Sequence, residues 1–385
     1  MRYKLQEIAN VAAGQGAPQG DHNYCDYGMP FVKAGNLAEL IAGADIGSIQ
    51  KVNEEVAKKH RLKLFRKGSV LFAKSGMSCL KGFVYVLPSD AYVVSHLACV
   101  TPEKVNSKYL KYYFLFHKPN TLIKDEAYPS ISLTDIANMV VQVPENNVVR
   151  NVVSTLEKVE FLLALYKSQL QKLDELVKSR FIEMFGDPET NPYRWEKTTV
   201  DDVCSSIVRG PFGSALKKEF FVERDNTTYK VYEQKHAIQK SATIGTYYVS
   251  EEKFNELRRF ECLPGDIIMS CSGTMGELYQ LPQGCEKGII NQALCKFTLN
   301  GKMLPIAFLT YMKETIGNLE TKGSGIKNIA AVSYVKSMPI NLPPMQVQHQ
   351  FSAFVQEVDK SKFAVRQALD KTQQLFDSLM QEYFG

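Results

Sequence analysis

Polar and basic side chains cluster in five short stretches of this 385-residue chain, and four of the stretches contain glycine. Lysine and arginine suit phosphate oxygens, while Asn, Gln, Ser, His and Arg can form hydrogen bonds with base edges in a major groove. Basic loops are also common on ordinary solvated surfaces, so each stretch alone is a weak signal. The stretches are VKAGN (32–36), AKSGMS (73–78), RGPFGSALKK (209–218), VYEQKH (231–236) and ETKGSGIKN (320–328).

We select polar residues in these loops and in neighbouring ones as candidate contacts to nucleic acid. Their side chains offer either a positive charge for phosphate or a donor and acceptor pattern for bases. In the first half of the chain they are Lys33, Asn36, Lys74, Ser75 and His96. In the second half they are Arg209, Ser214, Lys217, Lys218, Gln234, Lys235, His236, Ser270, Ser272, Gln292, Lys322 and Lys327.

The residues that could carry out catalysis or bind a metal are not spaced as in known catalytic, metal-binding or nucleotide-binding motifs. The eight cysteines contain no Cys-x-x-Cys pair, and the six histidines have no zinc or triad spacing. Gly14, Gly16 and Gly20 form a Gly-rich loop, but no buried strand leads into it and no Lys-Ser/Thr follows. The triplet at 191–193, Asn-Pro-Tyr, has the form of an amino-methyltransferase motif but lies in a polar linker that predicts a turn. We therefore expect reduced thiols, no metal site and no catalysis by the chain alone.

Composition sets broader bounds. The chain is 45% hydrophobic and 23% charged, as in folded soluble proteins, and no run of residues is apolar enough to span a bilayer. Because the start, MRYKLQEIANVAAGQG, lacks the apolar core of a signal peptide, we expect a cytoplasmic protein with no membrane partner. The net charge of +5 permits nucleic-acid binding without indicating it.

The helices and strands that must position these loops belong to a sequence segment that occurs twice in the chain. A shift of 199 residues aligns ELVKSRFIEMFG (175–186) with QLFDSLMQEYFG (374–385). Farther upstream the shift drifts, so that 65–76 lies against 262–273 and VVSHLAC (93–99) lies against IINQALC (289–295). A drift of this kind indicates loops of different length, and the chain is predicted to be two copies of one unit.

Each copy begins with a mixed α+β globular part. GSVLFAKSG and GFVYVLP are typical of strands between Gly-containing turns, and KYLKYYFLF is typical of a short helix. The pair Ser132 and Asp135 marks a helix start, and a strand closed by Pro144 follows. The predicted parts are 1–147 and 198–344 for the two globular domains, 148–186 and 345–385 for two spacer helices, and 187–197 for a linker.

Each copy ends with a long helix that has a heptad pattern. Positions spaced alternately by three and four residues, from 152 to 184 and from 351 to 383, are apolar in seventeen of twenty cases. This pattern predicts a coiled coil, although a helix lying against its own globular domain is the alternative. Arg180, Lys362 and Thr372 interrupt the pattern, and we interpret the two charged residues as register devices. The spacer residues chosen from the pattern are Leu156, Leu163, Leu170, Val177, Val355, Leu369 and Phe376.

The order of these parts resembles the specificity subunit of Type I restriction-modification systems, over essentially the whole chain. The resemblance rests on SRFIEMFGDP at the end of the first helix, on KGSVLFAKSG and INQALC, and on IAAVSYVKSMPINLPP before the second helix. It implies two α/β target-recognition domains, each reading half of a split double-stranded DNA sequence, joined by two antiparallel coiled-coil helices with pseudo-two-fold symmetry.

The resemblance also implies partners. Two methyltransferase subunits would carry S-adenosylmethionine and methylate adenine, and a restriction subunit would use ATP and Mg for translocation and cleavage. The chain itself would bind no cofactor. A helix of about 38 residues is roughly 57 Å long, which predicts an unread gap between the half-sites. The alternative is a two-domain coiled-coil scaffold that binds protein, which an apolar rather than basic face on each domain would favour.

Overall fold

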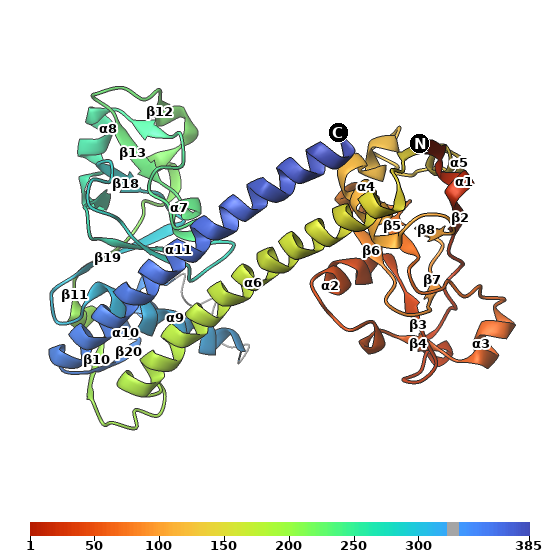
Figure 1. The fold of residues 1–385 in the computed structure, drawn as a ribbon. Helices are drawn as coiled ribbons and strands as arrows, with labels where there is room; N and C mark the ends of the chain where they lie inside the picture. The colour runs from red at the N-terminus through yellow and green to blue at the C-terminus, as the bar shows by residue number, and fades with distance from the viewer. Residues whose placement is uncertain (322–330) are drawn as a thin grey trace. The chain divides into compact units, whose positions relative to one another are not determined.

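A computed structural model describes residues 1–321 and 331–385; the side chains of 213, 214 and 318–321 are not described. Its contacts divide the chain into two units (Figure 1). Unit 1 consists of residues 1–167 and 367–385, and unit 2 consists of residues 168–366. Each unit contains one globular domain and a part of each long helix, so neither long helix belongs to one unit alone.

Unit 1 contains short helices and three small sheets. The predicted strands and helix form because continuous apolar runs such as VLFA are buried between turns that glycine permits. The helices are α1 (Leu5–Ile8), α2 (Leu37–Ile41), α3 (Glu54–Lys59), α4 (Ser107–His117) and α5 (Leu133–Ala137). The strands are β1 (Arg2–Lys4), β2 (Ala9–Ala13), β3 (Met29–Val32), β4 (Lys51–Val52), β5 (Val70–Ala73), β6 (Val84–Val86), β7 (Tyr92–Val93), β8 (Leu97–Pro102) and β9 (Val140–Gln142).

The sheets of unit 1 have the orders β1–β9, β2–β8–β5–β6 and β4–β3–β7. All neighbouring strands are antiparallel except β3 and β7, which are parallel. The predicted helix start at Ser132 is confirmed, because the Ser132 hydroxyl accepts a hydrogen bond from the Asp135 N–H at 3.0 Å.

Unit 2 repeats this plan with additional strands. Its helices are α7 (Gln234–Ile238), α8 (Glu251–Glu256), α9 (Pro305–Thr321) and α10 (Val332–Ser337). Its strands are β10 (Glu196–Thr199), β11 (Cys204–Arg209), β12 (Phe221–Val222), β13 (Tyr229–Tyr232), β14 (Tyr248–Val249), β15 (Glu261–Cys262), β16 (Ile267–Ser270), β17 (Leu278–Gln280), β18 (Gly288–Ile290), β19 (Leu294–Leu299) and β20 (Pro339–Leu342). The sheets are β10–β20, β11–β19–β16–β17 and β12–β14–β13–β18–β15.

Strand registers correct one part of the predicted alignment. In unit 1 Leu71 pairs with Cys99, and in unit 2 Ile268 pairs with Lys296. The structurally equivalent positions in these sheets are therefore 197 residues apart, and Cys99 corresponds to Lys296. The prediction that placed VVSHLAC over IINQALC, with Cys99 on Cys295, is wrong by one residue, because it matched residue types rather than hydrogen-bonded partners.

The two long helices are α6 (Asn146–Phe185) and α11 (Met345–Phe384), each of 40 residues (Figure 1). All twenty positions of the predicted heptad pattern are buried or half-buried. Among the chosen spacer residues, Leu156, Leu163 and Val355 are buried, while Leu170, Val177, Leu369 and Phe376 are half-buried. The heptad pattern therefore marks the contact face of each helix.

Within each unit the helices pack antiparallel. In unit 1, Val152 and Leu156 near the start of α6 share a core cluster with Met380 and Phe384 near the end of α11. In unit 2, the ring of Phe351 near the start of α11 lies 5.7 Å from the ring of Phe181 near the end of α6. The boundaries of the units, at 167/168 and 366/367, are themselves 199 residues apart, as in the sequence repeat. The helix pair thus follows the same repeat as the globular domains.

The linker after α6 is a turn, as predicted. Asn191 adopts a φ of 46°, and its side chain exchanges hydrogen bonds with the N–H and C=O groups of Trp195 at 2.9 Å each. The Trp195 indole donates to the Phe185 carbonyl at 3.0 Å, and the Tyr193 hydroxyl donates to the Glu183 carbonyl at 2.7 Å. The Asn-Pro-Tyr triplet therefore fastens the end of the helix. No described helix has the length and apolar character needed to cross a membrane.

Candidate nucleic-acid interface

In unit 1, several predicted contact residues lie where neighbouring strands end at one edge. Lys33 follows β3, and Ser95 and His96 follow β7, its parallel neighbour. Lys74 follows β5, and its N–H donates to the His96 carbonyl at 2.9 Å. Because parallel neighbours end at the same edge of a sheet, residues far apart in sequence meet there.

Ser75 and His96 form the polar centre of this edge. The Ser75 hydroxyl lies 2.8 Å from Nδ1 of His96, and the His96 side chain is exposed. One imidazole nitrogen is thus engaged by the protein, which fixes the orientation of the ring. The other nitrogen, Nε2, is oriented to accept or donate one hydrogen bond.

Lys33 and Asn36 lie on the same edge but are partly engaged. Nζ of Lys33 donates to Oε1 of Gln50 at 2.7 Å and lies 4.3 Å from the centre of the Tyr24 ring. Oδ1 of Asn36 accepts a hydrogen bond from the Lys33 N–H at 2.9 Å, which makes Asn36 part of the turn after β3. A ligand could compete for the Lys33 side chain more easily than for the Asn36 carbonyl, because only the latter holds the main chain.

Unit 2 has the equivalent edge. Arg209 ends β11, and its guanidinium donates to the main-chain carbonyls of Gln292 at 3.1 Å and Cys271 at 3.4 Å. Gln292 follows β18, which is parallel to β13, and Ser272 lies two residues past β16. Arg209, Ser272 and Gln292 are therefore brought together, and the last two have exposed side chains.

Four other predicted residues of unit 2 differ in exposure and in their ion-pair partners. Lys217 and Lys218 are exposed, and Nζ of Lys217 lies 3.5 Å from Glu219. Gln234 and Lys235 are half-buried at the start of α7, and Lys235 is paired with Glu233 at 2.6 Å. Lys217 and Lys218 are consequently the more accessible positive charges.

His236 and Ser270 are corrections to the prediction, because both are fully buried. Nδ1 of His236 accepts from the Glu233 N–H at 2.8 Å, and Nε2 donates to the Ile244 carbonyl at 2.7 Å. Burial lowers the pKa of this histidine, so it is a neutral core residue. The Ser270 hydroxyl donates to the Thr274 carbonyl at 2.6 Å and holds the turn after β16. Neither side chain can reach DNA in this structure.

For three predicted contact residues the structure describes no side chain. Lys322 and Lys327 lie outside the described residues. Ser214 lies in a described 3₁₀ helix, Gly213–Leu216, but its side chain is not described.

One glycine shapes each edge, Gly14 in unit 1 and Gly210 in unit 2, and no local sequence pattern predicts this role. The Gly14 N–H donates to the Leu97 carbonyl at 3.1 Å, and the Gly210 N–H donates to the Leu294 carbonyl at 3.0 Å. A Cβ atom on Gly14 would lie 2.1 Å from the Val93 carbonyl oxygen, and one on Gly210 would lie 1.9 Å from that of Asn291. Both glycines allow β2 or β11 to cross the neighbouring chain closely at the same point of the repeat.

Each domain is fastened to its helices by a different ion pair. In unit 1, both carboxylate oxygens of Glu160 on α6 lie 2.8 Å from Nζ of Lys111, and the Tyr112 hydroxyl donates to Glu160 at 2.7 Å. Burial together with this carboxylate raises the pKa of Tyr112. In unit 2, Lys178 on α6 pairs with Glu314 on α9 at 2.8 Å. These contacts hold the short helix of each domain against the long helix.

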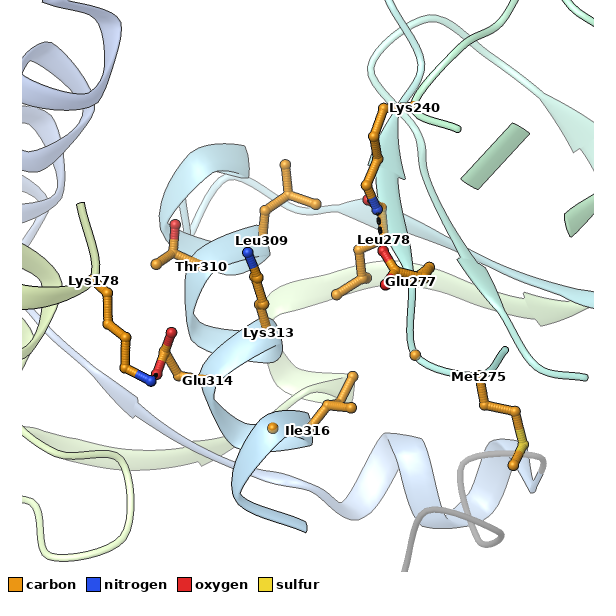
Figure 2. A pocket seen from close by; sticks show the side chains of 12 residues that line it. Lys178, Lys240, Met275, Glu277, Leu278, Leu309, Thr310, Lys313, Glu314 and Ile316 are labelled. Atoms are coloured by element: carbon orange, nitrogen blue, oxygen red, sulfur yellow. Dashed lines mark hydrogen bonds and ion pairs between the residues drawn. The ribbon is translucent and has the colours of Figure 1, made fainter. Parts of the chain in front are cut away.

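A polar cavity of unit 2 lies between α6, α9 and residues 275–278, with a volume of about 580 Å³. Figure 2 shows Lys178 directed toward Glu314 and Lys240 toward Glu277, with Lys313 between the two pairs. Each carboxylate is thus paired with an ammonium group, which makes a poor catalytic base. Within residues 1–321 and 331–385, no group of three His, Cys, Asp or Glu residues is placed to hold a metal ion.

The fold and its edges define a class of protein: two copies of an α/β domain, each followed by a 40-residue helix, with the helices paired antiparallel inside each unit. The family model described as the Type I restriction modification DNA specificity domain matches residues 1–175 and 192–373. The chain belongs to this family. The predicted fold class, α+β with two repeated domains and long antiparallel helices, is confirmed.

Individual relatives agree with this assignment. The Type I restriction enzyme MjaIX specificity subunit of Methanocaldococcus jannaschii is 29% identical over 148 residues, which are 37% of this chain and 33% of that relative. A Type I restriction-modification S subunit from M. genitalium has a TM-score of 0.54 at 12% identity, covering 100% of this chain and 96% of that one. A chain from a structure concerned with complex assembly and conformational transition of the type I R-M system has a TM-score of 0.61 at 16% identity, covering 100% and 97%. At these identities the two structures support the fold alone.

Proposed function

We propose that this chain is the sequence-specific DNA-binding subunit of a Type I restriction-modification complex. It recognises a bipartite double-stranded target and directs adenine methylation, or cleavage, by partner subunits. The observation that carries the proposal is the repetition of one polar edge, with Lys33, Lys74, Ser75 and His96 in unit 1 and with Arg209, Ser272 and Gln292 in unit 2. Each edge combines positive charge with hydrogen-bonding groups, which is the combination that phosphates and base edges require.

The duplication suits a split target. Two readers in one chain convert the second binding event into an intramolecular one, so that two modest affinities combine. The paired helices α6 and α11 then act as the spacer that sets the unread gap between the half-sites. Each unit reads one half-site.

We assign catalysis to the partners. Two methyltransferase subunits would hold S-adenosylmethionine, and a restriction and translocation subunit would use ATP and Mg, while this chain binds no cofactor. The complex would act on cytoplasmic DNA. The charge pairing inside the cavity of unit 2 is consistent with a non-catalytic role.

The decisive experiment maps methylated adenines in the source genome with and without this gene. We expect a bipartite motif to lose its methylation when the gene is removed. Exchange of residues 1–147 for those of a relative should then change one half of the motif, and exchange of 198–344 should change the other half. Methylation that is indifferent to both exchanges would refute the proposal.

A further inference from the structure

Two large apolar side chains project from the edge of unit 1 beside the polar residues. The side chain of Met77 is 68% exposed and that of Tyr128 is 83% exposed. Met77 begins a 3₁₀ helix, Met77–Lys81, immediately after the turn that carries Lys74 and Ser75. Tyr128 comes from the distant segment before α5. An isolated exposed apolar residue is ordinary, but two on opposite segments of one edge form a local surface.

Main-chain hydrogen bonds join the two segments that carry these residues. Ser75 and Ser130 form an antiparallel bridge, and the Gly76 N–H donates to the Pro129 carbonyl at 3.0 Å. Met77 and Tyr128 are the residues next to Gly76 and Pro129, and Met77 begins the 3₁₀ helix that follows this pairing. The Ile131 N–H also donates to the Lys74 carbonyl at 2.7 Å, which extends the pairing on the other side. Residues 74–76 and 129–131 thus form a hydrogen-bonded platform, and Met77 and Tyr128 flank it.

The same platform carries the polar centre of the edge. Ser75, two residues before Met77, is bonded to His96 at 2.8 Å. A duplex bound through Lys74 and His96 would therefore lie beside the exposed side chains of Met77 and Tyr128, which flank the platform. Methionine is among the apolar side chains that proteins insert between base steps, and an aromatic ring stacks on a base.

We propose that Met77 and Tyr128 form a wedge that enters the base stack of the half-site bound by unit 1. This inference rests on the proposed DNA-binding function. The wedge partly unstacks one base step, and stacking of the inserted side chains on the exposed base faces offsets that cost. It makes unit 1 sensitive to how easily the step opens, and flexible pyrimidine–purine steps open most easily.

Unit 2 also has a large exposed apolar side chain at its edge, but a different segment of the domain carries it. Phe212 is 68% exposed and follows Gly210 by two residues, and the guanidinium carbon of Arg209 lies 5.4 Å from its ring centre. The position equivalent to Met77 is Thr274, because Gly76 corresponds to Gly273 at the 197-residue spacing of these sheets. The Met77–Tyr128 wedge is therefore specific to unit 1, and its removal should leave the other half-site unaffected.

The test uses the full chain together with its methyltransferase partner and the duplex identified by methylation mapping. The fluorescent base 2-aminopurine replaces each purine of the target in turn, and its emission rises when a base unstacks. For the wild-type chain we expect a rise at one step of the half-site bound by unit 1. The double variant Met77→Ser, Tyr128→Ser should lose that rise and bind about tenfold or more weakly.

The matched control is Tyr27→Ser. Tyr27 is 67% exposed in the same unit but precedes β3, at the end of that strand remote from Lys33. This variant should retain both the fluorescence rise and the affinity. Circular dichroism should show unchanged folding in all variants, because the altered side chains are exposed.

The outcomes separate the two proposals. Specific binding of the bipartite duplex without any fluorescence rise, or with a rise that the double variant retains, would overturn the wedge and leave the proposed function standing. The same holds if the double variant binds DNA normally but loses a protein partner. Absence of sequence-specific binding by the wild-type complex would overturn both.

Discussion

Nζ of Lys296 lies 3.0 Å from Oδ2 of Asp266 inside the sheet of unit 2, with side chains only 9% and 2% exposed. The equivalent residues of unit 1 are Cys99 and Ser69. There the Ser69 hydroxyl lies 2.9 Å from that of Thr101, and the site carries no charge. One position of the repeated sheet thus holds a buried ion pair in one copy and a neutral hydrogen bond in the other.

Removing one partner of the buried pair should destabilise unit 2 strongly. Asp266→Ser alone or Lys296→Cys alone leaves an uncompensated buried charge, and we expect a loss of about 3–5 kcal/mol. The double variant recreates the pair of residue types present in unit 1 and should lose much less. Urea unfolding followed by the fluorescence of Trp195, the single tryptophan, reports on unit 2. A double variant as unstable as the single variants would contradict this reasoning.

The close crossing at Gly14 and Gly210 should not tolerate a side chain. Gly210→Ala places a methyl group where a Cβ lies 1.9 Å from the Asn291 carbonyl oxygen, and Gly14→Ala creates a similar clash at Val93. Because both clashes are with main chain, we expect each variant to displace its edge and to abolish recognition of one half-site. Gly16→Ala is the control, since no atom lies within 4 Å of a Cβ there. Methylation of half-site variants measures the effect, and equal activity of Gly210→Ala and Gly16→Ala would refute the prediction.

Acid should weaken unit 2 through His236. Its pKa is lowered in the folded chain by burial, whereas an unfolded histidine titrates near 6.5. The unfolded chain therefore binds more protons below about pH 6.5, and the free energy of unfolding falls as the pH decreases through that range, by at most about 1.4 kcal/mol per pH unit. Unfolding monitored at Trp195 between pH 7 and pH 5 should show this slope. His236→Gln should have a smaller slope, and an unchanged slope would assign the effect to other groups.

Lys362 is expected to be replaceable by leucine without loss of the fold. Its side chain is 11% exposed on the heptad face of α11, and its Nζ lies 2.7 Å from the carboxylate of Asp174 on α6. Because Asp174 is 63% exposed, it regains water when the lysine is removed, so no buried charge is left behind. Circular dichroism of Lys362→Leu should show unchanged helix content. Loss of folding would show that the ion pair is required for folding and is not merely a register device.

The salt dependence of DNA binding should distinguish lysines that contact phosphate from lysines elsewhere on the surface. If Lys74 contacts a phosphate, Lys74→Ala should weaken binding to all sequences and reduce the slope of log K against log salt by about one. Lys59→Ala removes an exposed charge at the end of α3, outside the edge, and should leave the slope unchanged. Binding measured at several salt concentrations decides the matter. Equal slopes for the two variants would remove Lys74 from the interface.

The repeat and the helices could be predicted because their signals are local. A heptad pattern directly marks the buried face of a helix, and the positions around Leu156 and Val355 follow it. Strand register is different, since it depends on hydrogen bonds between distant segments. Matching residue types placed Cys99 on Cys295, whereas pairing with Leu71 and Ile268 places it on Lys296.

The proposed binding edge was only partly predictable for a related reason. Polar loop residues can face solvent or fold back onto the main chain, and residue type alone does not distinguish His236 and Ser270 from His96 and Ser75. Only the tertiary structure shows that the first two satisfy main-chain groups. The roles of Gly14 and Gly210 likewise depend on a crossing chain that no local pattern reveals.

The unit that was duplicated and the unit that folds are different pieces of chain. The sequence repeat ends at Gly186, but unit 1 takes its helical partner from residues 367–385 and gives residues 168–186 to unit 2. An ancestor of half the length, equivalent to residues 1–186, would have carried the helix end 168–186, which packs in the other unit. Its own domain would have lacked the second helix segment, equivalent to 367–385, that packs against it. Two such chains would each supply what the other lacked. Fusion of the two would have made that exchange internal and left the two recognition edges free to diverge.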